Sequence, residues 1–223
     1  NCESKKQKDY LSLENTNCLK GILAICVFVC HLWAGVASNG MVSTDSFVMR
    51  NLGRICTSIG YLAVACFFFL SGYGLMFQYK KRGNGYLKGF LLKRVAPLYL
   101  VCIIFILFYW GTNVALGETV GVGVLIQSFL VGNTVISKGW YFQAILLWYV
   151  LFFLSFRFLK KEVHKILLLL VSFVLYVSLC LILKLESTWY EGCFCLILGV
   201  LWAEFRDKIE AFLPGKYVVL LIS

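Results

Sequence analysis

The stretch Gly21-Ile-Leu-Ala-Ile-Cys-Val-Phe-Val-Cys-His31-Leu-Trp-Ala-Gly-Val-Ala37 decides the fold class of this chain. It holds no charged residue apart from the ionisable His31. With Lys20 and Ser38 at its ends, it is long enough to cross a bilayer as a helix. An ionisable side chain is expensive at membrane depth and marks a functional site by default. The run therefore predicts a transmembrane helix that carries a functional histidine.

Lys20 precedes His31 by eleven residues. Eleven residues are almost three helical turns, so the two side chains project from one face of the predicted helix, about 16 Å apart along its axis. This spacing puts a cation at one membrane surface and a proton-transferring group near the midplane. Such a geometry suits a reaction whose donor arrives at one side and whose acceptor waits deeper or beyond.

The composition of the 223-residue chain is that of a polytopic membrane protein. Mean hydropathy is +0.83, and 61% of the residues are hydrophobic against 14% charged. The net charge of +10 falls in short loops between apolar runs, which favours loops at an anionic cytoplasmic leaflet over nucleic-acid binding. Most of the ten cysteines lie inside apolar runs without metal-ligand spacing, so we expect small hydrophobes and no metal site. We predict an all-α transmembrane helix bundle that forms one domain over residues 1–223.

The apolar runs predict six membrane spans and the start of a seventh. The ranges are about 20–37, 57–78, 95–114, 139–157, 165–184 and 190–205, with the seventh beginning near 217. Residues 119–136 are uncharged but rich in glycine and amides. If the N-terminus is cytoplasmic and this segment does not cross, seventeen of the 21 Lys and Arg residues are cytoplasmic, against twelve if it crosses. The positive-inside rule therefore predicts a cytoplasmic N-terminus and a re-entrant or interfacial helix.

Two polar clusters lie at the ends or in the interior of the predicted spans. Ser71 stands between Leu70 and Gly72 in the second span, where a small residue permits close helix approach and its hydroxyl can bond across the interface. Lys93 and Arg94 precede Pro97 at the start of the third span. They form either a cytoplasmic anchor or a phosphate-binding site at a helix N-terminus, which coenzyme A would fit.

Two further polar residues belong to the predicted outer side. Gln143 follows Trp140-Tyr141-Phe142, and Glu191 follows Trp189-Tyr190. Aromatic belts at the membrane interface explain most of these aromatic residues. Gln143 and Glu191 are the polar groups there that would line a cleft for an acceptor.

Several of these segments resemble acyltransferase family 3 of membrane proteins. Lys20 followed by Val27-Phe28-Val29-Cys30-His31 looks like the family's opening, in which a basic residue precedes a histidine. Phe67-Phe-Phe-Leu-Ser-Gly-Tyr73 is similar to its Phe-Phe-x-x-Ser-Gly-Phe/Tyr segment, and Lys93-Arg-Val-Ala-Pro-Leu-Tyr99 to its basic run before Pro-x-Tyr.

The chain also carries weaker signatures of the family, and it departs from the family pattern at some positions. Trp140-Tyr141-Phe142 and Gly199 match the weaker signatures. The chain has Lys20 where arginine is common and Leu91 where a further arginine is usual. Family members are longer, and this chain starts with Asn1 and stops at Ser223 within an apolar run, so we expect a fragment whose last spans are missing.

The resemblance implies an integral membrane acyltransferase of the O-acetyltransferase kind. It would move an acyl group, expected to be acetyl, from cytoplasmic acyl-coenzyme A to a hydroxyl of a cell-surface or lipid-linked carbohydrate outside the cytoplasm. His31 would be the general base, because imidazole exchanges a proton readily near neutral pH. Lys20, Lys93 and Arg94 would hold the donor or stabilise negative charge, and Ser71 would pack or orient the site. We expect no permanently bound cofactor, a location in the cell membrane, and modification of cell-envelope polysaccharide.

Two other interpretations compete with this one. A proton-coupled transporter or flippase would use His31 as a relay and predicts inverted repeats, and none is visible in the sequence. A structural membrane scaffold leaves the histidine unexplained.

Overall fold

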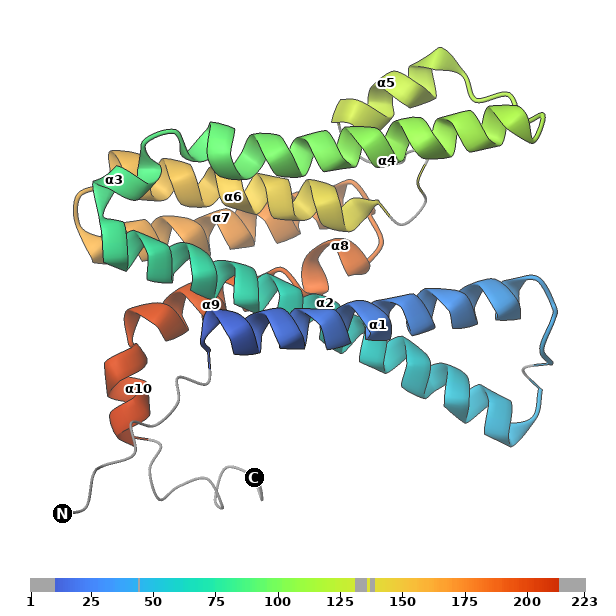
Figure 1. Ribbon diagram of the computed structural model, residues 1–223, viewed down its shortest axis with the longest axis horizontal. Coiled ribbons are helices and arrows are strands. Elements are labelled where there is room, and N and C mark those ends of the chain that lie inside the picture. Colours follow the sequence, from blue (N-terminus) through green and yellow to red (C-terminus); the bar gives the residue numbers. More distant parts are fainter. Residues whose placement is uncertain (1–10, 44, 131–135, 137–138, 213–223) are drawn as a thin grey trace.

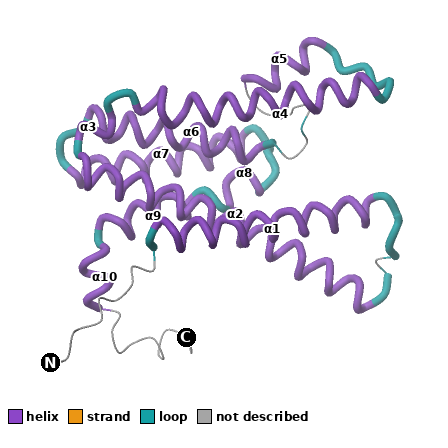
Figure 2. Tube along the Cα trace, viewed as in Figure 1, coloured by secondary structure: helices purple, strands orange, loops and turns teal. Residues whose placement is uncertain are grey.

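A computed structural model describes residues 11–43, 45–130, 136 and 139–212. The described residues form helices joined by loops, with no strand among them (Figures 1 and 2). The helices are α1 Leu13–Ser38, α2 Phe47–Arg82, α3 Asn84–Leu87, the π-helical η1 Leu91–Val95, α4 Ala96–Ala115, α5 Val122–Leu130, α6 Trp140–Phe158, α7 Glu162–Ile182, α8 Thr188–Glu191, α9 Phe194–Glu204 and α10 Arg206–Phe212. The predicted all-α bundle is confirmed.

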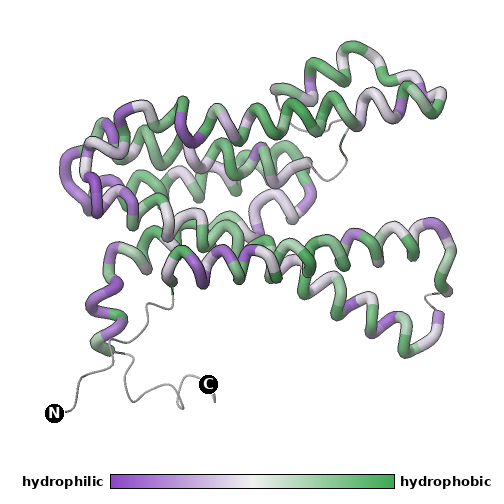
Figure 3. Tube along the Cα trace, viewed as in Figure 1, coloured by the Kyte–Doolittle hydropathy of each residue, from purple (hydrophilic) through white to green (hydrophobic). Residues whose placement is uncertain are grey.

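Five of these helices are long and apolar enough to cross a membrane. They are α1, α2, η1 with α4 as one continuous helix over Leu91–Ala115, α6 and α7. Each covers a predicted span to within two residues, and α2 extends it most because Ser46 caps its start and Gly83, at φ 56°, ends it. Polar residues gather where α2 meets α3 and where α6 meets α7 (Figure 3). We call this the basic end of the bundle, since Lys80, Lys81 and Arg82 lie there.

The prediction of a single membrane-spanning helix over 190–205 is wrong. The structure divides it into α8, of four residues, and α9, of eleven. Tight turns at Gly192 and Cys193 separate the two, and Gly192 packs against Phe68 and Ala65 of α2, where an added Cβ would come within 3.4 Å of the Phe68 ring. The seventh predicted span, near 217, lies outside the described residues.

The doubtful segment 119–136 contains α5, which has nine residues. Such a helix rises about 14 Å, too little for a hydrocarbon core of about 30 Å. α5 runs back alongside α4 (Figure 1), and the Tyr99 hydroxyl of α4 donates to the carbonyl oxygen of Phe129 at 3.1 Å. Tyr99 is sixteen residues before Ala115, about 24 Å back along α4. In its described part the segment therefore returns toward the basic end, as the re-entrant prediction expects.

The densest packing joins α2 to α9 through two glycines that face each other's backbone. A Cβ on Gly72 would collide with the carbonyl of Leu196, and one on Gly199 with the carbonyl of Phe69. Only glycine lets two helices approach this closely. Phe68, Met76 and Val200 are fully buried around this contact. The close helix approach predicted for the Ser71-Gly72 segment is confirmed at Gly72. Gly74, two residues further along α2, makes no such contact, since an added Cβ there would meet no atom within 4 Å.

Candidate active site

A cavity of about 240 Å³ opens at the basic end between α1, α2, α3, η1 and α6. Its wall combines three of the residues singled out from the sequence: Lys20 of α1, Ser71 of α2 and Arg94 of η1. These residues are far apart in sequence, and the helix packing brings them to one place. The cavity therefore offers two cations and a hydroxyl within one concave surface, as a binding site for an anionic ligand requires.

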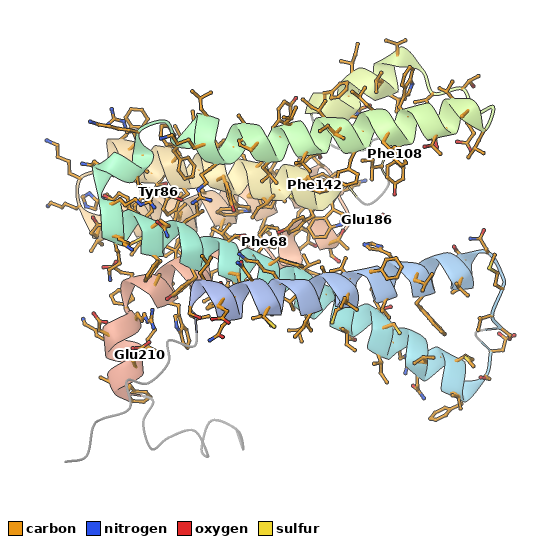
Figure 4. The ribbon with its side chains drawn as sticks, in the orientation of Figure 1. Phe68, Tyr86, Phe108, Phe142, Glu186 and Glu210 are labelled. Atoms are coloured by element: carbon orange, nitrogen blue, oxygen red, sulfur yellow. The ribbon has the colours of Figure 1, made fainter. Side chains whose placement is uncertain are left out.

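Arg94 is held at the cavity by an aromatic neighbour. Its guanidinium carbon lies 5.9 Å from the centre of the Tyr86 ring, within the range of a cation–π contact. Tyr86, in α3, is buried and lies at the basic end (Figure 4). Burial raises the pKa of the Tyr86 phenol, and the positive charge of Arg94 acts in the opposite direction. The phenol therefore stays neutral and serves as a platform for the guanidinium.

Other polar groups of the cavity were not predicted from the sequence. Tyr73 accepts a hydrogen bond from Arg206 at 2.7 Å, and Arg206 is paired with Glu210 at 2.6 Å, so α10 is tied to the cavity wall. Gln78 also lines the cavity, and its buried Oε1 has no hydrogen-bond partner among the described residues. A buried carbonyl oxygen without a partner favours a ligand or water that donates to it.

Lys93 does not join this site. Its side chain is exposed and does not line the cavity, although it neighbours Arg94 in the chain. Successive residues of a helix point about 100° apart. Both side chains are exposed, and Arg94 is the one of the two that lines the cavity.

His31 lies nearer the other end of the bundle and lines none of the three cavities described here. Its imidazole is exposed on α1. The preceding residue, Cys30, packs on Gly60 of α2, where an added Cβ would come within 2.5 Å of its sulfur. Because α1 and α2 are antiparallel, Tyr61, which follows Gly60, lies about 3 Å from the level of His31 along the bundle (Figure 1). Along α1, His31 is about 16 Å from Lys20, and along α2, Tyr61 is about 15 Å from Ser71.

A second pocket of about 240 Å³ opens at this level and contains Glu191. Tyr61 and Ala65 of α2, Trp140 of α6 and Thr188 of α8 form the rest of its wall, with apolar neighbours. The Thr188 hydroxyl is buried and has no hydrogen-bond partner among the described residues. We call this the Glu191 pocket. It combines a carboxylate, a free hydroxyl and two aromatic rings, a set that suits a hydroxylated ligand.

Gln143, expected beside Glu191, instead lines a third and larger cavity of about 420 Å³. This cavity lies between α4, α5, α6 and α7, and its wall is overwhelmingly apolar. The two residues of the predicted outer cleft therefore belong to two separate cavities. Trp140 and Trp189, whose ring centres are 6.4 Å apart, stand between them.

The fold and these sites define an all-helical, polytopic membrane protein with a cationic cavity at one end of its bundle. A family profile described as an acyltransferase domain, that of acyltransferase family 3, matches residues 13–223. Because the match covers nearly the whole chain, the chain belongs to this acyltransferase family. No curated protein and no solved structure shows significant similarity to the chain.

Proposed function

We propose that the protein moves an acetyl group from acetyl-coenzyme A to a hydroxyl of a carbohydrate on the other side of the membrane. The observation that supports this most is the meeting of Lys20, Ser71 and Arg94 in one cavity at the basic end. The positive-inside rule makes that end cytoplasmic, where coenzyme A is available. The N-terminus and the loops rich in lysine and arginine then share the cytoplasmic side of the cell membrane.

The basic-end cavity suits the donor because coenzyme A carries several phosphates. Lys20 and Arg94 bind phosphate through charge-assisted hydrogen bonds, and the start of the helix at η1 adds its dipole. The neutral Tyr86 fixes the guanidinium of Arg94 before the donor arrives. From phosphates held there, the flexible pantetheine arm carries the thioester toward the level of His31.

The Glu191 pocket suits the acceptor, because its carboxylate and the free Thr188 hydroxyl accept hydrogen bonds from sugar hydroxyls. His31, on the same level, takes the proton of the attacking hydroxyl as general base. The hydroxyl oxygen then bonds to the acyl carbon, the carbon–sulfur bond breaks, and the leaving thiolate accepts a proton. The products are an ester and coenzyme A with a free thiol.

Two substitutions at opposite ends test this assignment of sites. Arg94→Ala should raise the KM for acetyl-coenzyme A about tenfold and leave the KM for the acceptor unchanged, because a charged hydrogen bond to phosphate is lost. Glu191→Gln should raise only the KM for the acceptor, by a smaller factor. Both constants are measured from coenzyme A release by membranes of cells that make the full-length protein.

Lys93→Ala is the matched control for Arg94→Ala, since it removes the same charge from the neighbouring position outside the cavity. It should change the donor KM less than Arg94→Ala does. Equal effects of the two substitutions would mean that the basic end attracts the donor only by its overall charge. An increase in the acceptor KM alone with Arg94→Ala would reverse the assignment of the two ends.

A further inference from the structure

The large cavity between α4, α5, α6 and α7 has almost nothing polar to offer a ligand. Its hydroxyls are used within the fold: those of Tyr99, Ser128 and Tyr176 donate to the backbone carbonyls of Phe129, Val124 and Trp189 at 3.1, 2.8 and 2.8 Å. The amide of Gln143 is the other strongly polar group of the wall, and it too has a partner within the fold. The rest of the wall is mainly aliphatic and aromatic. A polar ligand would lose its hydration there without compensation.

The size and position of this cavity fit a hydrocarbon chain. Its volume of about 420 Å³ is nearly three times the roughly 150 Å³ of an apolar cavity that holds one benzene ring. α4 and α7 each pack on α6, and lining residues such as Leu179 and Leu183 remain more than half exposed. The cavity is therefore open along the side of helices that cross the membrane, where lipid chains are the surrounding solvent.

The apolar cavity and the Glu191 pocket are neighbours with opposite character. α8 and the residues just before it supply both walls: Leu185 and Trp189 face the apolar cavity, and Thr188 and Glu191 face the pocket. The Trp140–Trp189 pair is the boundary between them. Phe142 and Glu186, labelled in Figure 4, mark this region at the end of the bundle away from Tyr86. A molecule with an apolar tail and a hydroxylated head would occupy both cavities at once.

We propose that the acceptor is such an amphiphile, with its hydrocarbon chain in the apolar cavity and its uncharged, hydroxylated head in the Glu191 pocket. The proposal rests on the proposed acyltransferase function and narrows its acceptor to a lipid-linked carbohydrate. The head is a sugar rather than a phosphocholine group, because a carboxylate only accepts hydrogen bonds. Sugar hydroxyls donate them, whereas neither the phosphodiester nor the quaternary ammonium of phosphocholine has a proton to donate.

Photo-crosslinking in membranes tests this proposal without requiring turnover. Two probes share one alkyl chain with a terminal diazirine. One has a glucosyl or N-acetylglucosaminyl head, and the other has a phosphocholine head. We expect the sugar probe to label peptides of α4, α6 and α7 that line the apolar cavity, about tenfold more than the phosphocholine probe does, which corresponds to about 1.4 kcal/mol.

Two cavity-filling variants and one control locate the labelling. Cys102→Trp in α4 and Ala144→Leu in α6 place bulk inside the cavity, and both native residues are buried in its wall. Leu100→Trp adds bulk two residues from Cys102 at an exposed position outside the cavity. Labelling should fall about tenfold in the first two variants and persist in the third. Thermal unfolding of each purified variant identifies any that fails to fold.

Equal labelling by the two probes would overturn the proposal, since the cavity would then hold ordinary bilayer lipid. The absence of cavity labelling by the sugar probe would also overturn it. The proposed function fails separately, if membranes with the wild-type protein release no coenzyme A from acetyl-coenzyme A while the sugar probe still labels the cavity.

Discussion

The two halves of α2 are built differently. The half at the basic end lies between α9, α6 and α1, and Phe68 and Met76 are 0% and 1% exposed. The other half has α1 as its main partner, and Phe47 and Ile55 are 73% and 55% exposed. The wall of the cationic cavity belongs to the packed half, whereas the level of His31 and the Glu191 pocket belongs to the open half.

This difference matches the two kinds of site that we propose along one long helix. The proposed phosphate site needs residues held in place, and the glycine contact with α9 fixes Ser71 and Tyr73 relative to the bundle. A site for an acceptor that enters from the membrane needs an opening, which the sparser packing of the other half provides. Substitutions in the two halves should therefore separate effects on stability from effects on transfer.

The largest effect on stability is expected at the α2–α9 contact. Gly72→Ala places a Cβ against the backbone carbonyl of Leu196, which cannot move without separating the helices. We expect a loss of about 3 kcal/mol or more, the upper part of the range for overpacking. The thermal unfolding temperature of the protein in detergent measures it. Gly74→Ala, where the added Cβ meets nothing within 4 Å, is the control and should unfold like the wild type.

A smaller loss of stability but a clear loss of activity is expected in the open half. Gly60→Ala meets Cys30 of α1 at about 2.5 Å, so α1 must shift and carry the adjacent His31 with it. We expect about 1 kcal/mol in stability and a fall of about tenfold to a hundredfold in transfer rate, as for a misplacement of about 1 Å. Gly35→Ala on α1 has open space for its methyl group and should preserve both quantities. Normal activity in Gly60→Ala would show that the position of α1 is not critical.

The smallest effect on stability is expected at Lys80, which joins the packed half of α2 to the end of α9. Lys80 Nζ donates to the carbonyl of Glu204 at 2.8 Å and lies 3.7 Å from its carboxylate, at the end of α9. This pair is partly exposed, so Lys80→Met should cost about 0.5–1 kcal/mol in detergent unfolding. Lys81→Met removes an equal charge from the next position. If Lys81→Met lowers the free energy of unfolding as much as Lys80→Met does, the loss comes from the overall charge and not from the contact with Glu204.

Much of the fold follows from the sequence, because a long apolar run can satisfy its backbone in a membrane only as a helix. The five long helices each cover a predicted span to within two residues for this reason. The division of 190–205 was missed, since hydropathy gives the length of an apolar run and carries no information on its backbone. Gly192 was the local signal, and its meaning depends on the contact with Phe68.

The sites were predictable only in part, since a sequence shows which residues share a helix face but not which helix that face meets. Lys20, Ser71 and Arg94 line one cavity, and their roles there stay a prediction. Lys93 was grouped with Arg94 because the sequence does not orient η1 about its axis. Tyr73 and Tyr86 were missed because an aromatic residue at a cavity and one in the core look alike in sequence. Their partners, Arg206 and Arg94, became visible only in three dimensions.

The most direct test of the account is the His31→Ala variant of the full-length protein. Membranes with equal amounts of wild-type and variant protein are given acetyl-coenzyme A and a carbohydrate acceptor, and released coenzyme A thiol is measured with time. Removing the imidazole makes α1 more apolar and should leave insertion and unfolding unchanged. The account predicts a loss of at least about a hundredfold in the rate of transfer, as for the loss of a general base. Wild-type turnover in His31→Ala at equal abundance would contradict it.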